Sequence, residues 1–208
     1  MKDAEHYEQW FSTRFGKRAD RAEREILGDL LSDIVGVRSL LDVGCGTGHF
    51  AGLWRSTGLA AVGIDKDIRM LGFVRAHRPW FPVIRGDAMA LPVRDQSFDV
   101  VAMITVLEFL EDPIEGLREA ARVARKALLL GALNSVSPLA WYRRLRRVRA
   151  HRDARFFSPW GLTQLVRMAL PGRHVVLTCR TGLGPVPWLD RPSSLPFGAF
   201  IGMTVDLL

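Results

Sequence analysis

The 208-residue sequence has little cysteine and no long apolar run. Its two cysteines, Cys45 and Cys179, have the spacing of neither a zinc site nor a disulfide framework. The first twenty residues are polar and carry charges of both signs, and no segment approaches the roughly 20 consecutive apolar residues that span a membrane. We therefore expect a soluble, cytoplasmic protein with reduced thiols, and no residue pattern predicts a metal site.

Internal repeats, low-complexity segments and linkers between domains are also absent from the sequence. Hydrophobic residues make up 48% and charged residues 25%, a balance typical of a globular chain with a buried core. One domain is the expected organisation at this length. We therefore predict a single domain over residues 1–208.

The sequence has fewer acidic than basic residues. The 29 lysines and arginines exceed the 22 aspartates and glutamates, which gives a formal net charge of +7. Such an excess is compatible with nucleic acid, with an anionic membrane surface or with an acidic substrate. It is equally compatible with an arginine-rich genome, so the charge alone leaves the partner open.

From Leu40 onward, short apolar runs alternate with helical patterns, which is typical of a parallel α/β sheet. The runs predict seven strands, at Ser39–Val43, Ala60–Ile64, Pro82–Arg85, Phe98–Ile104, Ala127–Ala132, His174–Cys179 and Gly198–Val205. The patterns between them predict helices at His49–Ser56, Asp67–Ala76, Pro113–Arg122, Pro138–Arg149 and Pro159–Ala169.

The last two predicted strands are separated by a proline-dense segment with no room for a helix. A parallel crossover normally needs a helix, so this pair is expected to be antiparallel. The segment, with Trp188 at its middle, is either a lid on the substrate side or an ordered surface loop.

Two helices are expected before the first strand. The first carries an aromatic stripe at helical spacing, made of Tyr7, Trp10, Phe11 and Phe15. The second has an apolar face and a glycine suited to its C-terminal cap, at Ile26, Leu27, Leu30, Leu31, Ile34 and Gly36.

The first strand ends in an unusual loop, LLDVGCGTGHF, that spans residues 40–50. Gly44, Gly46 and Gly48 alternate there, and glycine tolerates positive φ and lets the backbone approach a ligand closely. The backbone N–H groups at the start of the following helix favour an anionic or polar ligand group. The spacing differs from the dinucleotide fingerprint G-x-G-x-x-G, and Asp42 adds a carboxylate at the strand end. The loop therefore indicates a different nucleoside.

The D-x-G-x-G-x-G pattern formed by Asp42, Gly44, Gly46 and Gly48 resembles the first motif of class I S-adenosylmethionine-dependent methyltransferases. The form LDVGCGTG is most similar to the ubiquinone- and menaquinone-biosynthesis group, methyltransferase type 11. The resemblance implies an α/β fold, a Rossmann-like three-layer sandwich with a seven-stranded, mostly parallel sheet and an antiparallel last strand. It also implies a helical cap at 1–36, a cofactor-binding core at 37–132, and a substrate-side insert with the last two strands at 133–208.

In this family the N-terminal region caps the pocket, so Tyr7 and Phe11 either face the reacting methyl group or pack on the domain. Asp65 ends the second predicted strand, where a carboxylate can accept hydrogen bonds from both ribose hydroxyls. The alternative for Asp65 is an N-cap of the helix that follows. The resemblance carries adenine contacts over to Lys66 and Met70.

The triplet Gly86-Asp87-Ala88 follows the third predicted strand and matches the G-D-A element of the family. The resemblance implies that Asp87 accepts a hydrogen bond from the adenine amino group and that Ala88 lies beside the ring. A turn aspartate is the alternative. By the same resemblance, the backbone around Ile104 and Thr105 lies near the methionine end of S-adenosylmethionine.

The segment after Ile104 lacks a familiar base. Many relatives carry an imidazole after the position of Glu108, and this chain has Phe109. Transfer from a sulfonium chiefly requires alignment and exclusion of water, and it needs a base only if the acceptor must lose its proton early. Glu108, His6 and Tyr7 are candidates by position, and the catalytic residues stay unassigned.

The basic segment 141–157 contains seven arginines between aromatic residues. It is interpreted as a solvated face and pocket wall, as a peripheral contact with a membrane or lipid substrate, as a site for an anionic small substrate, or as a nucleic-acid contact. The expected activity is methyl transfer to a small organic acceptor, lipophilic or anionic, and nucleic acid is disfavoured. The rival hypotheses are a non-catalytic cofactor-binding module and a nucleic-acid or protein methyltransferase. The oligomeric state is left open.

Overall fold

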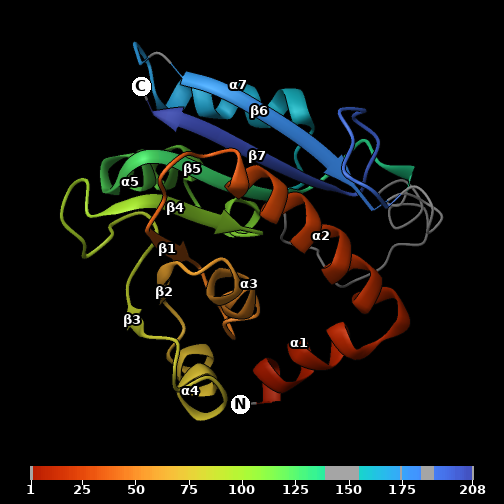
Figure 1. Ribbon diagram of the computed structural model, residues 1–208, viewed down its shortest axis with the longest axis vertical. Coiled ribbons are helices and arrows are strands. Elements are labelled where there is room, and N and C mark those ends of the chain that lie inside the picture. The colour runs from red at the N-terminus through yellow and green to blue at the C-terminus, as the bar shows by residue number, and fades with distance from the viewer. Residues whose placement is uncertain (1, 139–154, 174, 184–189, 208) are drawn as a thin grey trace.

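The computed structural model describes residues 2–138, 155–173, 175–183 and 190–207. Its centre is a seven-stranded sheet (Figure 1). The strands are β1 Ser39–Val43, β2 Ala60–Asp65, β3 Val83–Arg85, β4 Phe98–Ile104, β5 Ala124–Leu133, β6 Val175–Gly182 and β7 Phe200–Leu207. All seven predicted strands are confirmed, with some shifted bounds. Strands β2, β5, β6 and β7 end later than predicted, β5 also begins earlier, and β3 and β7 begin later.

The strand order in the sheet is β3-β2-β1-β4-β5-β7-β6. Strands β1 to β5 pair in parallel, and β7 runs antiparallel to both of its neighbours, β5 and β6. The predicted Rossmann-like α/β sheet with an antiparallel last strand is therefore confirmed. Because the sheet order reverses direction at β1 and β4, the carboxyl ends of these strands border a crevice in which open α/β sheets bind ligands.

The helices that the structure describes are α1 Lys2–Ser12, α2 Arg14–Ser32, α3 Ala51–Ser56, α4 Ile68–His77, α5 Pro113–Val123 and α7 Pro159–Ala169, with a 3-10 turn at Leu107–Phe109. Helices α5 and α7 begin with a proline, after N-caps at Asp112 and Ser158. The helix predicted at 138–149 and the residue Trp188 lie outside the described residues, except for Pro138.

Helix α2 ends before its predicted cap. Its C-cap is Asp33, and Gly36 lies beyond the helix in a turn with φ of 66°. The predicted role of Gly36 as the helix cap is therefore wrong. The predicted apolar face is correct, since Ile26, Leu27 and Leu30 are fully buried.

The sheet separates two apolar layers because successive side chains of a strand point to opposite faces. Leu128 and Leu130 of β5 pack on the side of α5 and α7, whereas Leu129 packs on the side of α2 and α3. Figure 1 shows this three-layer arrangement, with α2 crossing one face of the sheet. The described part of the chain contains no helix that is long and apolar enough to cross a membrane.

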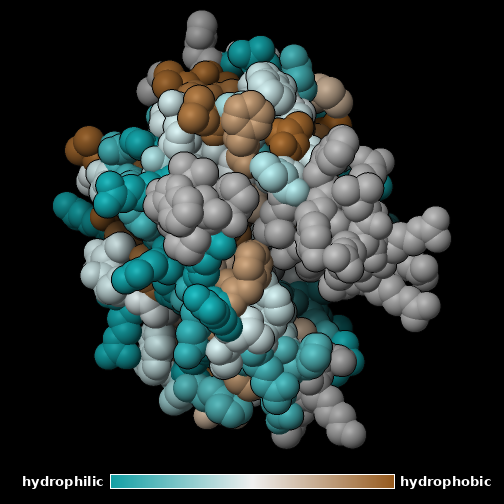
Figure 2. All heavy atoms as spheres, turned by 90° about the vertical axis from the view of Figure 1, so that its right-hand side faces the viewer, coloured by the Kyte–Doolittle hydropathy of each residue, from teal (hydrophilic) through white to brown (hydrophobic). Residues whose placement is uncertain are grey.

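The surface near the junction of α1 and α2 is mixed in character. Seen from that side, hydrophobic residues gather towards the top of the molecule, and hydrophilic residues predominate over its lower half (Figure 2). Some large apolar side chains of the described residues are exposed, among them Trp160 and Met168 of α7 and Val176 of β6.

Candidate functional site

A cavity of about 250 Å³ lies at the carboxyl ends of β1, β2 and β4. Eight of the ten residues predicted to bind a cofactor line it: Asp42, Gly44, Gly46, Asp65, Lys66, Asp87, Ala88 and Ile104. The fold thus brings residues from four separate segments of the chain to one place. Their roles in binding stay predictions.

The glycine loop turns sharply from β1 into α3. Gly44, Gly46 and Gly48 have φ angles of 70°, 54° and 72°, which side chains other than glycine rarely adopt. At Gly44 a Cβ atom would also lie 2.4 Å from Cγ2 of Val106. Only glycine therefore fits at position 44, and its absent side chain leaves room for the segment that follows β4.

Asp65 is held at the end of β2 by two backbone donors. Its Oδ2 accepts a hydrogen bond from the N–H of Gly46 at 2.8 Å, and its Oδ1 accepts one from the N–H of Asp67 at 2.8 Å. The N-cap of α4 is Asp67, whose carboxylate accepts from the N–H of Arg69. The alternative interpretation of Asp65 as that N-cap is therefore wrong. Each oxygen of a carboxylate has a further lone pair, so Asp65 can still accept from ligand hydroxyls.

Asp42 lies deeper, with 3% of its surface exposed. Its Oδ2 accepts a hydrogen bond from the indole Nε1 of Trp54 at 2.9 Å. Burial raises the pKa of Asp42 to about 7, although the bond from Trp54 opposes this rise. The Asp42 carboxyl thus sits in the cavity wall as a group that titrates close to neutral pH.

The Gly86-Asp87-Ala88 segment forms a turn at the cavity. Asp87 Oδ1 accepts a hydrogen bond from the N–H of Met89 at 2.9 Å, so the side chain shapes the turn, as the alternative interpretation expected. Asp87 is exposed and Ala88 is buried. The two interpretations are compatible because Asp87 Oδ2 and the unused lone pair of Oδ1 can still accept.

Two predicted residues are placed differently from the other eight. Gly48 is at the end of the glycine loop, where its N–H donates to the carbonyl of Cys45 at 2.8 Å, and it is not among the cavity-lining residues. Met70 lies in the first turn of α4, also away from the lining. The positions of Gly48 and Met70 neither support nor exclude a contact with the cofactor, so both contacts stay predictions.

Thr105, whose backbone was expected near the methionine end, also lines the cavity. Other lining residues were not assigned to cofactor binding from the sequence: Tyr7, Cys45, His49, Phe50, Gly86, Val106, Phe109 and Leu110. Cys45, Gly86 and Val106 lie within two residues of a predicted strand end, where open α/β sheets bind ligands, so their position could have indicated them. His49 had no such signal, because it meets α1 only when that helix folds against the glycine loop.

Glu108 does not line this cavity. It is 1% exposed, and its Oε1 accepts a hydrogen bond from the N–H of Leu133 at 2.7 Å, while Oε2 has no hydrogen-bond partner among the described residues. Burial raises its pKa to about 7. Glu108 therefore holds the end of β5, whereas the next two residues, Phe109 and Leu110, line the cavity.

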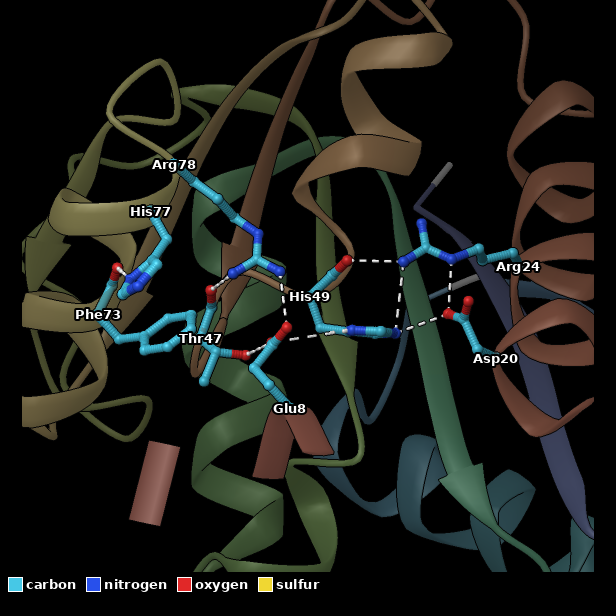
Figure 3. A network of polar contacts seen from close by, with 8 residues as sticks. All are labelled: Glu8, Asp20, Arg24, Thr47, His49, Phe73, His77 and Arg78. Carbon is cyan, nitrogen blue, oxygen red and sulfur yellow. Dashed lines mark hydrogen bonds and ion pairs between the residues drawn. The ribbon is translucent and has the colours of Figure 1, made fainter. Parts of the chain in front are cut away.

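His49 connects the glycine loop to the N-terminal helices. Its Nε2 lies 2.6 Å from Asp20 Oδ1 of α2, and its ring stacks on Phe11 of α1 with 3.5 Å between the ring centroids. Arg24 donates to the backbone carbonyl of His49 at 2.7 Å. Figure 3 shows the side chains of Asp20 and Arg24, both from α2, pointing toward His49.

The comparisons with known proteins agree with this geometry. Residues 41–129 match the family described as methyltransferase domain. The chain is 35% identical over 105 residues to a demethylmenaquinone methyltransferase of Renibacterium salmoninarum, over 50% of this chain and 44% of that protein. It is 30% identical over 146 residues to a malonyl-[acyl-carrier protein] O-methyltransferase of Serratia marcescens, over 67% and 54%. The chain thus spans about half the length of these curated relatives.

A solved structure resembles the whole described fold. A SAM-dependent methyltransferase of Thermotoga maritima is 26% identical with a TM-score of 0.80, over 97% of this chain and 94% of that chain. The two chains therefore share their fold over nearly their whole lengths. Residues 41–129 of this chain thus belong to the methyltransferase domain family, and the chain as a whole has the fold of a SAM-dependent methyltransferase.

Proposed function

We propose that this protein transfers the methyl group of S-adenosylmethionine to a small organic acceptor and releases S-adenosylhomocysteine. The observation that carries the proposal is the convergence of the glycine loop, Asp65 and Asp87 on one cavity. Asp65 presents a fixed carboxylate for the ribose, and Asp87 offers an acceptor for the adenine amino group. A protein that had lost cofactor binding would have no need to keep all three.

Asp42 suits the charged end of the cofactor. S-adenosylmethionine carries a positive sulfonium and an ammonium group, and a nearby carboxylate favours both when it is ionised. The carbonyl of Ile104 accepts a hydrogen bond from the hydroxyl of Thr105 at 2.8 Å, so the backbone turns at the end of β4 beside the cavity. In this proposal that turn faces the methionine part of the cofactor.

Part of the remaining wall is apolar, and Tyr7, Cys45, His49 and Thr105 add polar groups to it. Phe50, Val106, Phe109 and Leu110 line the cavity without offering a side-chain base. These residues favour an acceptor with an apolar or aromatic portion that reacts as a neutral or already ionised nucleophile. During transfer the carbon–sulfur bond breaks, the bond from carbon to the nucleophile forms, and any proton leaves to solvent or substrate. The names of the relatives point to demethylmenaquinone and to malonyl-[acyl-carrier protein] as their acceptors, and both are worth testing with this chain.

The proposal also includes the cellular location of the enzyme. We expect the enzyme in the cytoplasm, with a peripheral membrane contact through 141–157 if its acceptor is lipophilic. Most of that segment lies outside the described residues. Retention on anionic but not on neutral vesicles, sensitive to salt, would support this contact, and equal indifference to both would remove it.

The proposed cofactor is tested by calorimetric titration with S-adenosylmethionine and S-adenosylhomocysteine, with NAD and ATP as controls. One-site binding of the first pair alone supports the proposal and justifies an acceptor screen by mass spectrometry. Binding without any methyl transfer across a broad screen would favour a regulatory cofactor-binding module. Failure of both ligands to bind a folded sample would contradict the proposal.

A further inference from the structure

Helix α1 forms part of the cavity wall but has few hydrophobic anchors, chiefly the buried Ala4 and the half-buried Phe11, whose ring stacks on His49. Its Tyr7 lines the cavity. Among residues 4–12, only Ala4 is fully buried, while Tyr7 and Trp10 are 40% and 38% exposed. A helix that buries so little apolar surface depends on other contacts to stay in place.

Glu8 supplies those contacts from the middle of α1 (Figure 3). Its Oε1 accepts a hydrogen bond from the hydroxyl of Thr47 in the glycine loop at 2.5 Å. Its Oε2 accepts one from Nη2 of Arg78, which follows α4, at 2.9 Å. Arg78 also donates from Nη1 to the carbonyl of Thr47 at 2.8 Å. The three residues therefore form a closed ring of bonds, which we name the Glu8 clasp.

The Glu8 clasp is partly shielded from water. Thr47 is fully buried, and the side chains of Glu8 and Arg78 are 24% and 21% exposed. Charge-assisted hydrogen bonds are stronger than neutral ones, and shielding strengthens them further. His49 Nδ1 lies 4.0 Å from the same carboxylate. Glu8 is thus the point at which α1 is fastened to the loop that shapes the cofactor site.

Helix α2, in contrast, is fixed to the sheet. Ile26 and Leu30 are fully buried, and Ile26 packs so closely on β7 that a Cβ at Gly202 would lie 2.3 Å from its Cγ2. Only Thr13 separates α1 from α2. Because one residue joins a loosely anchored helix to a firmly anchored one, α1 can turn away while α2 stays in place.

We propose that Glu8 is a positioning residue that keeps α1 and its Tyr7 closed over the cofactor cavity, so that opening of the Glu8 clasp sets the rate of cofactor exchange. The inference rests on the proposed function, because it takes the cavity to be the S-adenosylmethionine site. Glu8 acts through Thr47 and Arg78, and it forms no part of the proposed ligand contacts.

The first test compares Glu8→Gln with Glu5→Gln by surface plasmon resonance with S-adenosylhomocysteine. Glu5 is an exposed glutamate of the same helix and serves as the matched control. The dissociation rate should rise about tenfold in Glu8→Gln and stay unchanged in Glu5→Gln, because loss of the charge weakens the bond to Arg78. The melting temperature should fall by less than about 4 °C. Equal dissociation rates in wild type and Glu8→Gln would overturn the proposal.

A second test does not depend on cofactor binding. Amide hydrogen exchange in residues 4–12 should be faster in Glu8→Gln and in Thr47→Val than in wild type, with exchange in α2 unchanged. The double variant should exchange no faster than the faster single variant, because both break the same clasp. Unchanged exchange in α1 would reject the clasp. If exchange in α1 becomes faster in the variants but neither they nor the wild type bind the cofactor, the proposed function fails, while the Glu8 clasp is still shown to hold α1 in place.

Discussion

Trp54 donates its indole N–H to Asp42 at 2.9 Å, and both side chains are buried beneath the glycine loop. The glycine loop connects β1 to α3, and this hydrogen bond joins the same two elements directly through their side chains. It also gives the buried carboxyl of Asp42 a hydrogen-bond donor in place of water. The shape of the loop and the charge of Asp42 are therefore coupled.

Replacement Trp54→Phe should lower the free energy of unfolding by about 1–3 kcal/mol, because it leaves the Asp42 carboxyl without its donor. Since the pKa of Asp42 is raised to about 7, the loss should be larger at pH 8, where the carboxyl is ionised, than at pH 5. Denaturant unfolding at the two pH values measures both effects. The exposed Trp160→Phe is the control, and equal losses at both pH values would contradict the coupling.

Replacement Asp65→Ala should weaken S-adenosylmethionine binding at least about tenfold, because it removes the proposed ribose acceptor. The comparison variant is Asp67→Ala, which removes the N-cap of α4 and should cost about 1 kcal/mol of stability without changing the affinity. Calorimetric titration and thermal unfolding of both variants separate the two roles. Wild-type affinity in a folded Asp65→Ala protein would remove Asp65 from the site.

Replacement Gly44→Ala should destabilise the fold by about 2–4 kcal/mol, because the new Cβ combines a left-handed φ with a clash against Val106. Gly46→Ala has a similar φ but no atom within 4 Å of the new Cβ, and should cost about 1 kcal/mol. The double variant Gly44→Ala/Val106→Ala should recover part of the stability that Gly44→Ala loses beyond Gly46→Ala. Equal unfolding midpoints for the two single variants would show that the contact with Val106 does not matter.

The buried Glu108 should make stability depend on pH. Its pKa is raised from 4.5 to about 7, so its contribution is complete below pH 4.5 and is lost as the pH rises through 7. Glu108→Gln should reduce the change in unfolding free energy between low and high pH by up to about 3 kcal/mol. Asp42 also has a raised pKa, so part of the slope should remain. Urea unfolding from pH 4.5 to 8 tests this against the exposed Glu111→Gln, and identical slopes in wild type and Glu108→Gln would be inconsistent with it.

The sheet and the glycine loop could be predicted because their signals are local. An apolar run that stops at Gly44, and a carboxylate 21 residues later at Asp65, mark two strand ends without reference to the rest of the chain. Parallel strands bring such ends to one edge of a sheet. The prediction placed eight of its ten residues on the cavity for this reason.

The attachments of the N-terminal helices could not be predicted in the same way. Glu8 and Thr47 are 39 positions apart, and Asp20 and His49 are 29 apart. A polar residue on an amphipathic helix gives no indication of which distant group it will bond. The wrong cap at Gly36 has a related cause, since Asp33 ended α2 before the glycine that the pattern favoured.

The position of β7 inside the sheet, between β5 and β6, has a consequence for synthesis on the ribosome. Synthesis proceeds at about 5–20 residues per second, so β6 stays unpaired for seconds until residues 200–207 have emerged. The part of the apolar face of α2 around Ile26 is made before any strand of the sheet and stays uncovered longer, because Ile26 packs on Gly202 of β7. The nascent chain therefore exposes both surfaces until β7 has emerged, and chaperones that recognise apolar segments have this interval in which to bind them.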